Sequence, residues 1–257
     1  MMSDNLRRSP GTVALVGSGE YLDVMNEVDT FLLNTVGGAS TAKVALLPTA
    51  SGLEPNGPTS WNNLGLRHFK NLGVSDIRAT QIIDRDSAFA QAQLDLLQGA
   101  DFYYFSGGNP QHTIDALRDS PAWNIIKTAY EHGAVLAGCS AGAMMLSART
   151  ISVRQVMMGE PVGFVEAMGI VPNVIVFPHF DRMAGFLDQD RFQHLLRSVP
   201  DSDRVVGIDE DTALVRIEPN EMPDTSARWR VMGRQTVSIF NGDKKPRILH
   251  SGDEITL

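Results

Sequence analysis

Short apolar runs alternate with helix-like segments along most of this chain, and this alternation constrains its fold more than any other feature. The apolar runs predict strands at residues 12–16, 44–47, 77–83, 102–105, 134–137, from about 174, and at 205–208. Helical spacing predicts helices at 25–36, 64–72, 87–97, 113–117, 123–132 and 191–197. Such alternation favours a mainly parallel sheet with helices on both faces. The expected fold class is therefore α/β, with three layers.

The pattern changes near the C-terminus. Four short apolar runs, at 213–217, 229–232, 237–240 and 248–250, are separated by turn residues such as Asn241-Gly242-Asp243. They predict an antiparallel β appendage packed on the edge of the sheet. No linker-like segment separates the two regions, so residues 1–257 are expected to form a single domain, with 1–10 flexible.

Composition and charge narrow the function classes. Hydrophobic residues make up 43% of the chain and charged residues 20%, which is typical of a globular protein. A net charge of −8 argues against nucleic acid or an anionic membrane as the main partner. Cys139 is the only cysteine, which excludes an intramolecular disulfide and a cysteine-based metal cluster. No signal-like or membrane-spanning segment is evident, and we expect a cytoplasmic protein.

The segment Gly138-Cys139-Ser140-Ala141-Gly142 carries the clearest chemical signal. It follows the apolar run 134–137 and leads into a helix-favouring segment, which is the setting of a G-x-S-x-G nucleophile elbow. The turn is sharp enough that only small residues fit at its flanks. Free N–H groups at the start of the next helix would stabilise developing negative charge. The alternative is a plain strand-to-helix turn without chemistry.

A serine nucleophile needs a base and a group that orients it. His179 ends a buried strand and should lie at the same sheet edge as Ser140. The other histidines lie in predicted helices or in the C-terminal region, namely His68, His112, His132, His194 and His250. Two acids, Glu160 and Glu166, lie between Ser140 and His179, and either could orient the imidazole; Glu210, farther along the chain, is a further alternative. The alternatives are a histidine that closes a strand and two solvated loop carboxylates.

An oxyanion hole requires two N–H donors near the nucleophile. In a nucleophile elbow the residue after the nucleophile supplies one of these N–H groups, and here that residue is Ala141. The pair Gly107-Gly108 ends the strand at 102–105 and can turn a second N–H toward the same point. Ligands of such sheets bind at the carboxyl ends of the strands, where both turns fall. Alone, Gly107-Gly108 would be read as an ordinary turn.

Three segments together resemble a known family: Phe105-Ser106-Gly107-Gly108-Asn109, Gly138–Ala143 and Pro178-His179-Phe180. They look like the serine peptidases related to cyanophycinase and dipeptidase E, whose fold is similar to that of the class I glutamine amidotransferases. The resemblance runs from about residue 13 to the C-terminus. It implies Ser140 as nucleophile, His179 as general base, and Gly108 and Ala141 as oxyanion donors. Gly159-Glu160 followed by 168–172 matches the cyanophycinase pattern, which favours Glu160 over Glu166 as the acid.

The resemblance also bears on the substrate. Asn109 and Pro178 are closer to the dipeptidase branch than to the cyanophycinases, and Asn109 is a candidate substrate-binding residue. The family implies an exopeptidase or isopeptidase for small peptides, with no metal or cofactor. Neither a monomer nor a homodimer is favoured by the sequence.

Recognition of an acidic substrate group would require a cation. Arg149, Arg154 and Arg182 are near the catalytic segment in sequence, and an arginine fork binds a carboxylate bidentately. We expect Arg154 or Arg182, but not both, to face the site. The alternative for each is a surface arginine.

Four other functions compete with a serine peptidase. A glutamine amidotransferase would need a cysteine at the elbow, and Cys139 is one place early. An α/β-hydrolase esterase normally has its histidine much farther downstream. A nucleotide-binding oxidoreductase fails because Gly17-Ser18-Gly19 lacks the third glycine of the fingerprint. A non-catalytic binding module on the same fold remains the alternative from a different class.

Overall fold

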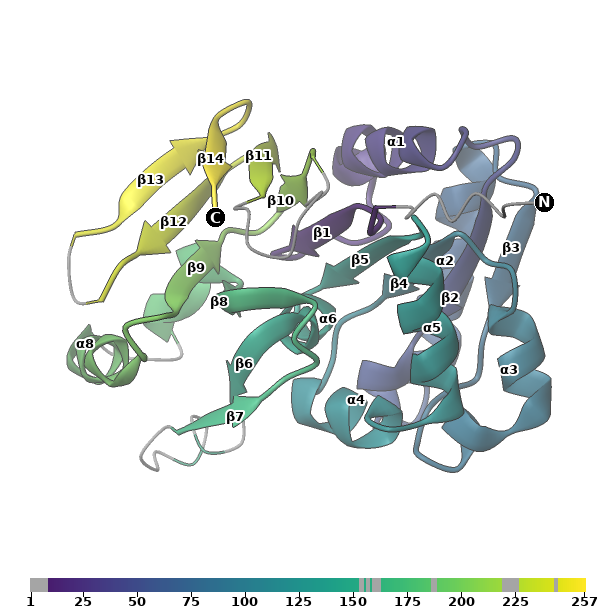
Figure 1. Cartoon of the computed structure of the whole chain (residues 1–257), viewed down its shortest axis with the longest axis horizontal. Coiled ribbons are helices and arrows are strands. Elements are labelled where there is room, and N and C mark those ends of the chain that lie inside the picture. Colours follow the sequence, from purple (N-terminus) through teal and green to yellow (C-terminus); the bar gives the residue numbers. More distant parts are fainter. Residues whose placement is uncertain are drawn as a thin grey trace, which may run out of the picture.

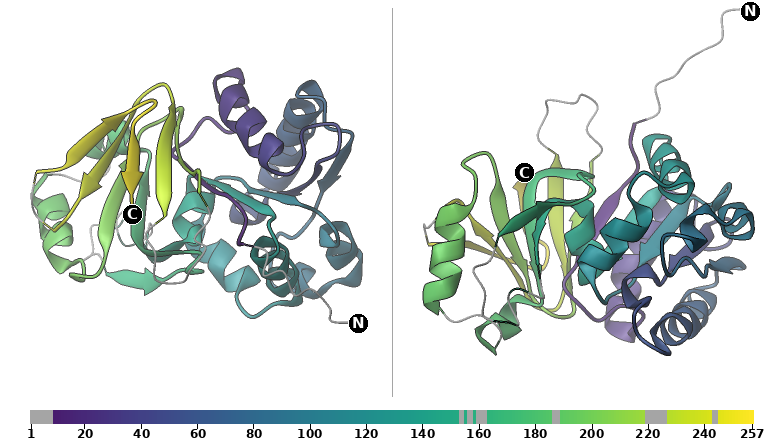
Figure 2. Two further views of the ribbon diagram at one scale, coloured as in Figure 1. Left: turned by 45° about the horizontal axis from the view of Figure 1, so that its top comes forward. Right: turned by 90° about the horizontal axis from the view of Figure 1, so that it is seen from below.

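The computed structural model describes residues 9–152, 155, 158, 163–185, 189–218, 227–242 and 245–257 (Figure 1). It is a mixed α/β structure with two β-sheets that lie side by side, as both views of Figure 2 show. Of the segment predicted to be flexible, residues 1–8 lie outside the described residues. Among the helices that the structure describes, none has the length and apolar character needed to cross a membrane.

The first sheet has eight strands in the order β14-β11-β10-β1-β5-β4-β2-β3. From β1 to β3 neighbouring strands are parallel, whereas β10, β11 and β14 are antiparallel. Its strands are β1 (Val13–Val16), β2 (Lys43–Leu47), β3 (Asp76–Ala79), β4 (Phe102–Phe105), β5 (Val135–Cys139), β10 (Thr212–Arg216), β11 (Arg228–Gly233) and β14 (Glu254–Thr256).

The second sheet has six strands in the order β13-β12-β9-β8-β6-β7. Its central strands β6, β8 and β9 are parallel, and the outer ones are antiparallel. They are β6 (Ser147–Ile151), β7 (Phe164–Glu166), β8 (Val171–Pro178), β9 (Arg204–Ile208), β12 (Thr236–Phe240) and β13 (Arg247–His250).

Helices cover the faces of both sheets. One face of the first sheet packs on α1 and α2, and its other face packs on α3 to α6 and on the second sheet. The outer face of the second sheet packs on α8 (Figure 1). The helices are α1 (Asn26–Thr35), α2 (Gly57–Asn71), α3 (Gln91–Leu97), α4 (Pro110–Leu117), α5 (Pro121–Glu131), α6 (Ala141–Leu146) and α8 (Gln189–Ser198), with short 3₁₀ turns at Asp23–Met25, Thr49–Ser51, Ser87–Phe89 and Phe180–Gly185.

The continuous apolar character of the central strands follows from burial on both faces. In β1, Val13 and Leu15 belong to the core shared with the second sheet, while Ala14 and Val16 face α1 and α2. A strand covered on both sides has no solvent-facing positions. Its sequence is therefore an unbroken apolar run rather than an alternation of apolar and polar residues.

Two of the helices begin with strong local signals. The Asn109 side chain accepts a hydrogen bond from the His112 backbone N–H at the start of α4, and Ser120 does the same for Trp123 at the start of α5. Each cap is followed by a proline, which fits the first turn because its missing N–H has no partner there. The Asn109 cap fixes the start of α4, the first helix after β4, and the Ser120 cap fixes the start of α5.

The prediction of one mainly parallel sheet with a β appendage was wrong in its topology. β8 and β9, expected to continue the first sheet, belong to the second. The C-terminal strands divide between the sheets, because β10, β11 and β14 extend the first sheet beyond β1 while β12 and β13 join the second. Strands β6, β7 and β14 were not predicted. An apolar run indicates that a strand is buried, but it does not indicate which strand lies beside it.

Candidate active site

Ser140 occupies a strained turn between β5 and α6. Its backbone has φ of 51° and ψ of −112°, a region that residues with a Cβ rarely adopt. A Cβ atom at Gly138 would lie 2.4 Å from the Gly142 backbone carbon, and one at Gly142 would lie 2.4 Å from the Phe105 carbonyl oxygen. The Ser140 N–H donates to the Val16 carbonyl at 2.9 Å. The turn therefore needs both glycines, and it holds the serine in one conformation.

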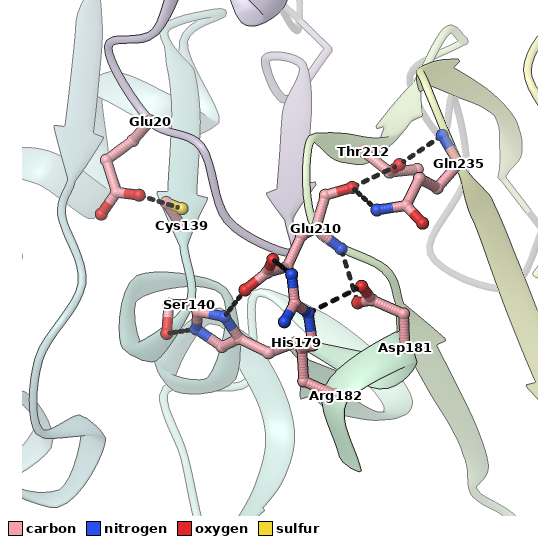
Figure 3. A network of polar contacts seen from close by, with 9 residues as sticks. All are labelled: Glu20, Cys139, Ser140, His179, Asp181, Arg182, Glu210, Thr212 and Gln235. Atoms are coloured by element: carbon pink, nitrogen blue, oxygen red, sulfur yellow. Dashed lines mark hydrogen bonds and ion pairs between the residues drawn. The ribbon is translucent and has the colours of Figure 1, made fainter. Parts of the chain in front are cut away.

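The His179 imidazole lies directly against the serine hydroxyl. His179 follows β8, and its Nε2 is 2.6 Å from Ser140 Oγ (Figure 3). The two residues come from different sheets, and they meet because α6, which follows Ser140, packs against β8. The sequence placed both residues at one edge of a single sheet; the structure places them together across two sheets.

The backbone around His179 is held by its neighbours. His179 has a φ of 138°, and its carbonyl accepts from the Arg182 N–H at 3.0 Å. The next residue, Phe180, packs against Phe192 and Phe240. Gly207 on β9 makes room for this ring, because a Cβ there would lie 2.4 Å from Phe180 Cγ. The packing of Phe180 therefore fixes the backbone next to His179.

Glu210 supplies the carboxylate at the other imidazole nitrogen. Its Oε1 lies 3.4 Å from His179 Nδ1. Glu210 is in the turn between β9 and β10, where its N–H donates to Asp181 Oδ1 and its carbonyl accepts from Thr212 Oγ1 and Gln235 Nε2, each at 3.0 Å (Figure 3). These backbone contacts hold the turn that carries the carboxylate.

The sequence predicted Glu160 or Glu166 as the acid beside His179. Glu160 lies outside the described residues. Glu166 lies on β7, where its side chain is 82% exposed and its carboxylate is 4.0 Å from Arg118. The sequence offered Glu210 only as a further alternative to these two acids. The available signal was its position after the strand predicted at 205–208, at a strand end like those of Ser140 and His179.

Of the three candidate arginines, Arg182 lies beside the Ser140–His179 pair. Its guanidinium is 3.3 Å from Glu210 Oε2 and 3.4 Å from Asp181 Oδ2, and its side chain is 67% exposed (Figure 3). Arg149 forms an ion pair with the buried Asp203 in the second sheet. Arg154 lies outside the described residues.

The glycine turn after β4 lies next to the serine. A Cβ atom at Gly107 would be 3.8 Å from Ser140 Oγ. Gly108 has a φ of 141°, and a Cβ there would lie 2.3 Å from the Ala50 carbonyl oxygen, so this position requires glycine. Asn109 is exposed, and its side chain caps α4 as described above. Ala141 is the first residue of α6, where backbone N–H groups have no intrahelical acceptor.

Sequence reasoning missed a buried carboxylate that joins the two turns. Glu20 accepts from the Gly107 N–H at 3.0 Å and from the Cys139 thiol at 2.8 Å. Burial, and secondly the charge of Glu20, hold the pKa of the Cys139 thiol well above its usual range. Cys139 therefore stays protonated near neutral pH and lacks the thiolate that a cysteine nucleophile needs.

The described residues contain no group of three or more His, Cys, Asp or Glu side chains arranged to hold a metal ion. The site offers the chemistry of a serine hydroxyl with a basic partner. An imidazole nitrogen at hydrogen-bond distance can remove the hydroxyl proton as the oxygen attacks an electrophilic carbon.

Comparison with known proteins agrees with this reading. The model of peptidase family S51 matches residues 13–221. The crystal structure of a peptidase from an acI-B1 Actinobacterium is 31% identical, with a TM-score of 0.82 over 98% of each chain. The structure of a putative peptidase E protein from Listeria monocytogenes EGD-e shares the fold, with 19% identity and a TM-score of 0.59 over 83% of this chain and 96% of that one. A search of curated proteins returned no match.

The family match covers most of the chain and includes the elbow, the glycine turn and the histidine. It confirms the resemblance stated from the sequence motifs. The chain belongs to peptidase family S51, and it is a serine-type peptidase.

Proposed function

We propose that this peptidase hydrolyses small peptides, as an exopeptidase or isopeptidase, with a catalytic triad of Ser140, His179 and Glu210. The observation that carries the proposal is the 2.6 Å contact between Ser140 Oγ and His179 Nε2. In the first step His179 accepts the hydroxyl proton while Oγ attacks the scissile carbonyl. His179 then returns the proton to the leaving amine, and water releases the acyl group by the same steps.

Glu210 takes the role that the sequence assigned to Glu160. A carboxylate near Nδ1 keeps the imidazole proton on that atom, which leaves the Nε2 lone pair facing the serine. It also stabilises the imidazolium formed when Ser140 loses its proton. The 3.4 Å separation is long for a hydrogen bond, and such contacts commonly shorten when substrate binds.

The oxyanion hole consists of the Gly108 and Ala141 N–H groups. Support comes from the closeness of Gly107 to Ser140 and from the free first turn of α6. The arrangement of helices on both faces of the first sheet also supports the class I glutamine amidotransferase-like, three-layer fold, in which such an elbow projects from the end of a central strand.

Arg182 is the proposed recognition residue for an acidic substrate group. It is exposed and lies beside Glu210, so a substrate carboxylate in the site would be within reach of a guanidinium fork. In Arg182→Met, we expect kcat/KM for substrates with an acidic P1 residue to fall about 10–100-fold relative to neutral ones, the effect of losing a charged hydrogen-bond pair. Arg154→Met is the matched variant and should leave this ratio unchanged. A ratio altered only in Arg154→Met would assign the role to Arg154 instead.

The acid assignment is tested by two isosteric substitutions. Glu210→Gln should lower kcat by about 10²–10⁴-fold, because the amide no longer stabilises the imidazolium or enforces its tautomer. Glu160→Gln should retain activity close to that of the wild type. Steady-state hydrolysis of a dipeptide panel that includes Asp-X and β-Asp-X members measures both. A large loss in Glu160→Gln, with Glu210→Gln active, would reverse the assignment.

A further inference from the structure

Glu20 is a buried carboxylate that the triad does not use. It lies in the loop after β1 and is only 7% exposed. Burying a carboxylate costs several kcal/mol unless its oxygens are hydrogen-bonded. Both oxygens of Glu20 have partners, since Oε1 accepts from the Gly107 N–H and Oε2 from the Cys139 thiol. An apolar side chain at this position would leave the buried Gly107 N–H without this acceptor, so the carboxylate bears on the conformation of the glycine turn.

The two donors to Glu20 directly adjoin the proposed oxyanion donors. Gly107 precedes Gly108, and Cys139 precedes the Ser140–Ala141 peptide. Figure 3 shows Glu20 reaching across to Cys139 on the strand that delivers Ser140. One carboxylate therefore connects the glycine turn after β4 to the elbow after β5, two segments that supply one N–H each.

The glycine turn needs such a tether. Two successive glycines have wide conformational freedom, and the direction of the Gly108 N–H depends on the torsions of Gly107. A hydrogen bond from the Gly107 N–H to a fixed acceptor sets the plane of the peptide before it. Oxyanion donors act through being held in place before the reaction, so a loosened turn weakens transition-state binding more than substrate binding.

We propose that Glu20 is a positioning residue for the oxyanion hole, acting through the Gly107 N–H and the Cys139 thiol. This inference rests on the proposed function, because it assumes that Ser140 attacks a carbonyl whose oxygen is held by Gly108 and Ala141. Glu20 itself does not touch the reacting atoms in this role.

Two variants remove the tether in steps. In Glu20→Gln the amide nitrogen cannot accept a hydrogen bond, so one of the two contacts is lost, and the remaining one loses the negative charge of its acceptor. Cys139→Ala removes only the thiol contact and leaves Gly107 bound. We expect kcat to fall about 10–100-fold in Glu20→Gln, below the loss of about 10²–10³-fold that follows removal of a whole oxyanion donor. Cys139→Ala should show a smaller decrease, and KM should stay within about threefold in both.

A peptide boronic acid separates positioning from a merely structural role. Its tetrahedral serine adduct places an oxygen in the oxyanion hole, so its affinity should fall in parallel with kcat, as expected of a transition-state analogue. Asp203→Asn is the matched control, because Asp203 is also a buried acid with two hydrogen-bond partners, Arg149 and Ser202, but it lies directly before β9 of the second sheet. This control should lose stability without losing kcat or boronate affinity.

The outcomes are distinguishable. If Ser140→Ala is inactive but Glu20→Gln keeps wild-type kcat and boronate affinity, the positioning role is wrong and the triad stands. If Glu20→Gln fails to fold, the stepwise decrease in kcat and boronate affinity is tested on Cys139→Ala, and no decrease there overturns the role. If Ser140→Ala is as active as the wild type, the proposed function fails, and the inference fails with it.

Discussion

At the scale of single residues, the most unusual feature is a serine in a conformation that favours glycine. The φ of 51° and ψ of −112° at Ser140 carry a strain of about 1–3 kcal/mol for a residue with a Cβ. Ser140→Gly should therefore be more stable than Ser140→Ala, by about 1 kcal/mol after the entropy cost of glycine is subtracted. Urea unfolding of the two variants measures this difference. A less stable Ser140→Gly would show that the elbow is not strained.

Cys139 provides a second test at this scale. Burial raises the pKa of its thiol, and the raised pKa keeps the thiol protonated as the pH passes the usual cysteine value of about 8.5. Disulfide reagents attack only the thiolate. We expect Ellman's reagent to leave the folded protein unmodified up to about pH 9 and to react with one thiol per chain after unfolding in urea. Rapid modification of the folded protein would contradict this environment.

At the scale of elements, the packing of β8 on β9 sets the position of His179. A Cβ atom at Gly207 would lie 2.4 Å from Phe180 Cγ, so Gly207→Ala must displace the ring that follows His179. We expect a loss of stability of about 1–3 kcal/mol, as for other overpacked sites, together with a lower kcat. Gly99→Ala is a control for glycine substitution, since nothing lies within 4 Å of its Cβ position, although its φ of 69° also disfavours alanine. An unchanged kcat in Gly207→Ala would mean that Phe180 does not position His179.

A buried pair joins α1 to α2 away from the reacting atoms. His68 Nε2 lies 2.7 Å from Asp29 Oδ2, and Asp29 is 1% exposed. Asp29→Ala leaves a buried imidazole without its partner, which should cost about 2–4 kcal/mol of unfolding free energy. The cost of Asp29→Ala and His68→Ala together should be less than the sum of the single costs, because each alone breaks the same contact. Strict additivity in urea unfolding would contradict this coupling.

At the scale of the whole molecule, the two sheets share one hydrophobic core. Leu15 and Leu136 of the first sheet and Val176 and Ile208 of the second belong to the same buried cluster. We therefore propose that the chain unfolds as one domain, in a single transition. Urea curves from far-ultraviolet circular dichroism and from tryptophan fluorescence should coincide. Two separated transitions would instead indicate two independently stable units.

The sequence predicted the elements of the fold better than their arrangement. The parallel strands β1, β2, β4 and β5 were predicted within two residues at each end, because burial on both faces leaves continuous apolar runs. The split into two sheets was not predicted, since hydrophobicity does not specify a strand's neighbours. Strand β7 has only three residues, too few for an alternating or continuous apolar pattern to indicate a strand.

The site was predictable where local chemistry demanded a residue type. The glycines around Ser140 reveal the elbow because any larger residue would collide with backbone atoms. The position of His179 followed from its place at a strand end. Glu210 was only a further alternative and Glu20 was not predicted, because the contacts of both depend on segments that are distant in the sequence. Whether Glu160 has a part in the site stays a prediction.

The central claim is that Ser140 is the nucleophile of a peptidase acting on small peptides. Hydrolysis of the dipeptide panel, including Asp-X and β-Asp-X members, by the wild type and by Ser140→Ala tests it most directly. We predict that the wild type cleaves at least one member and that kcat falls by about 10⁴-fold or more in the variant, with the folded structure retained. An unchanged kcat in Ser140→Ala would contradict the claim.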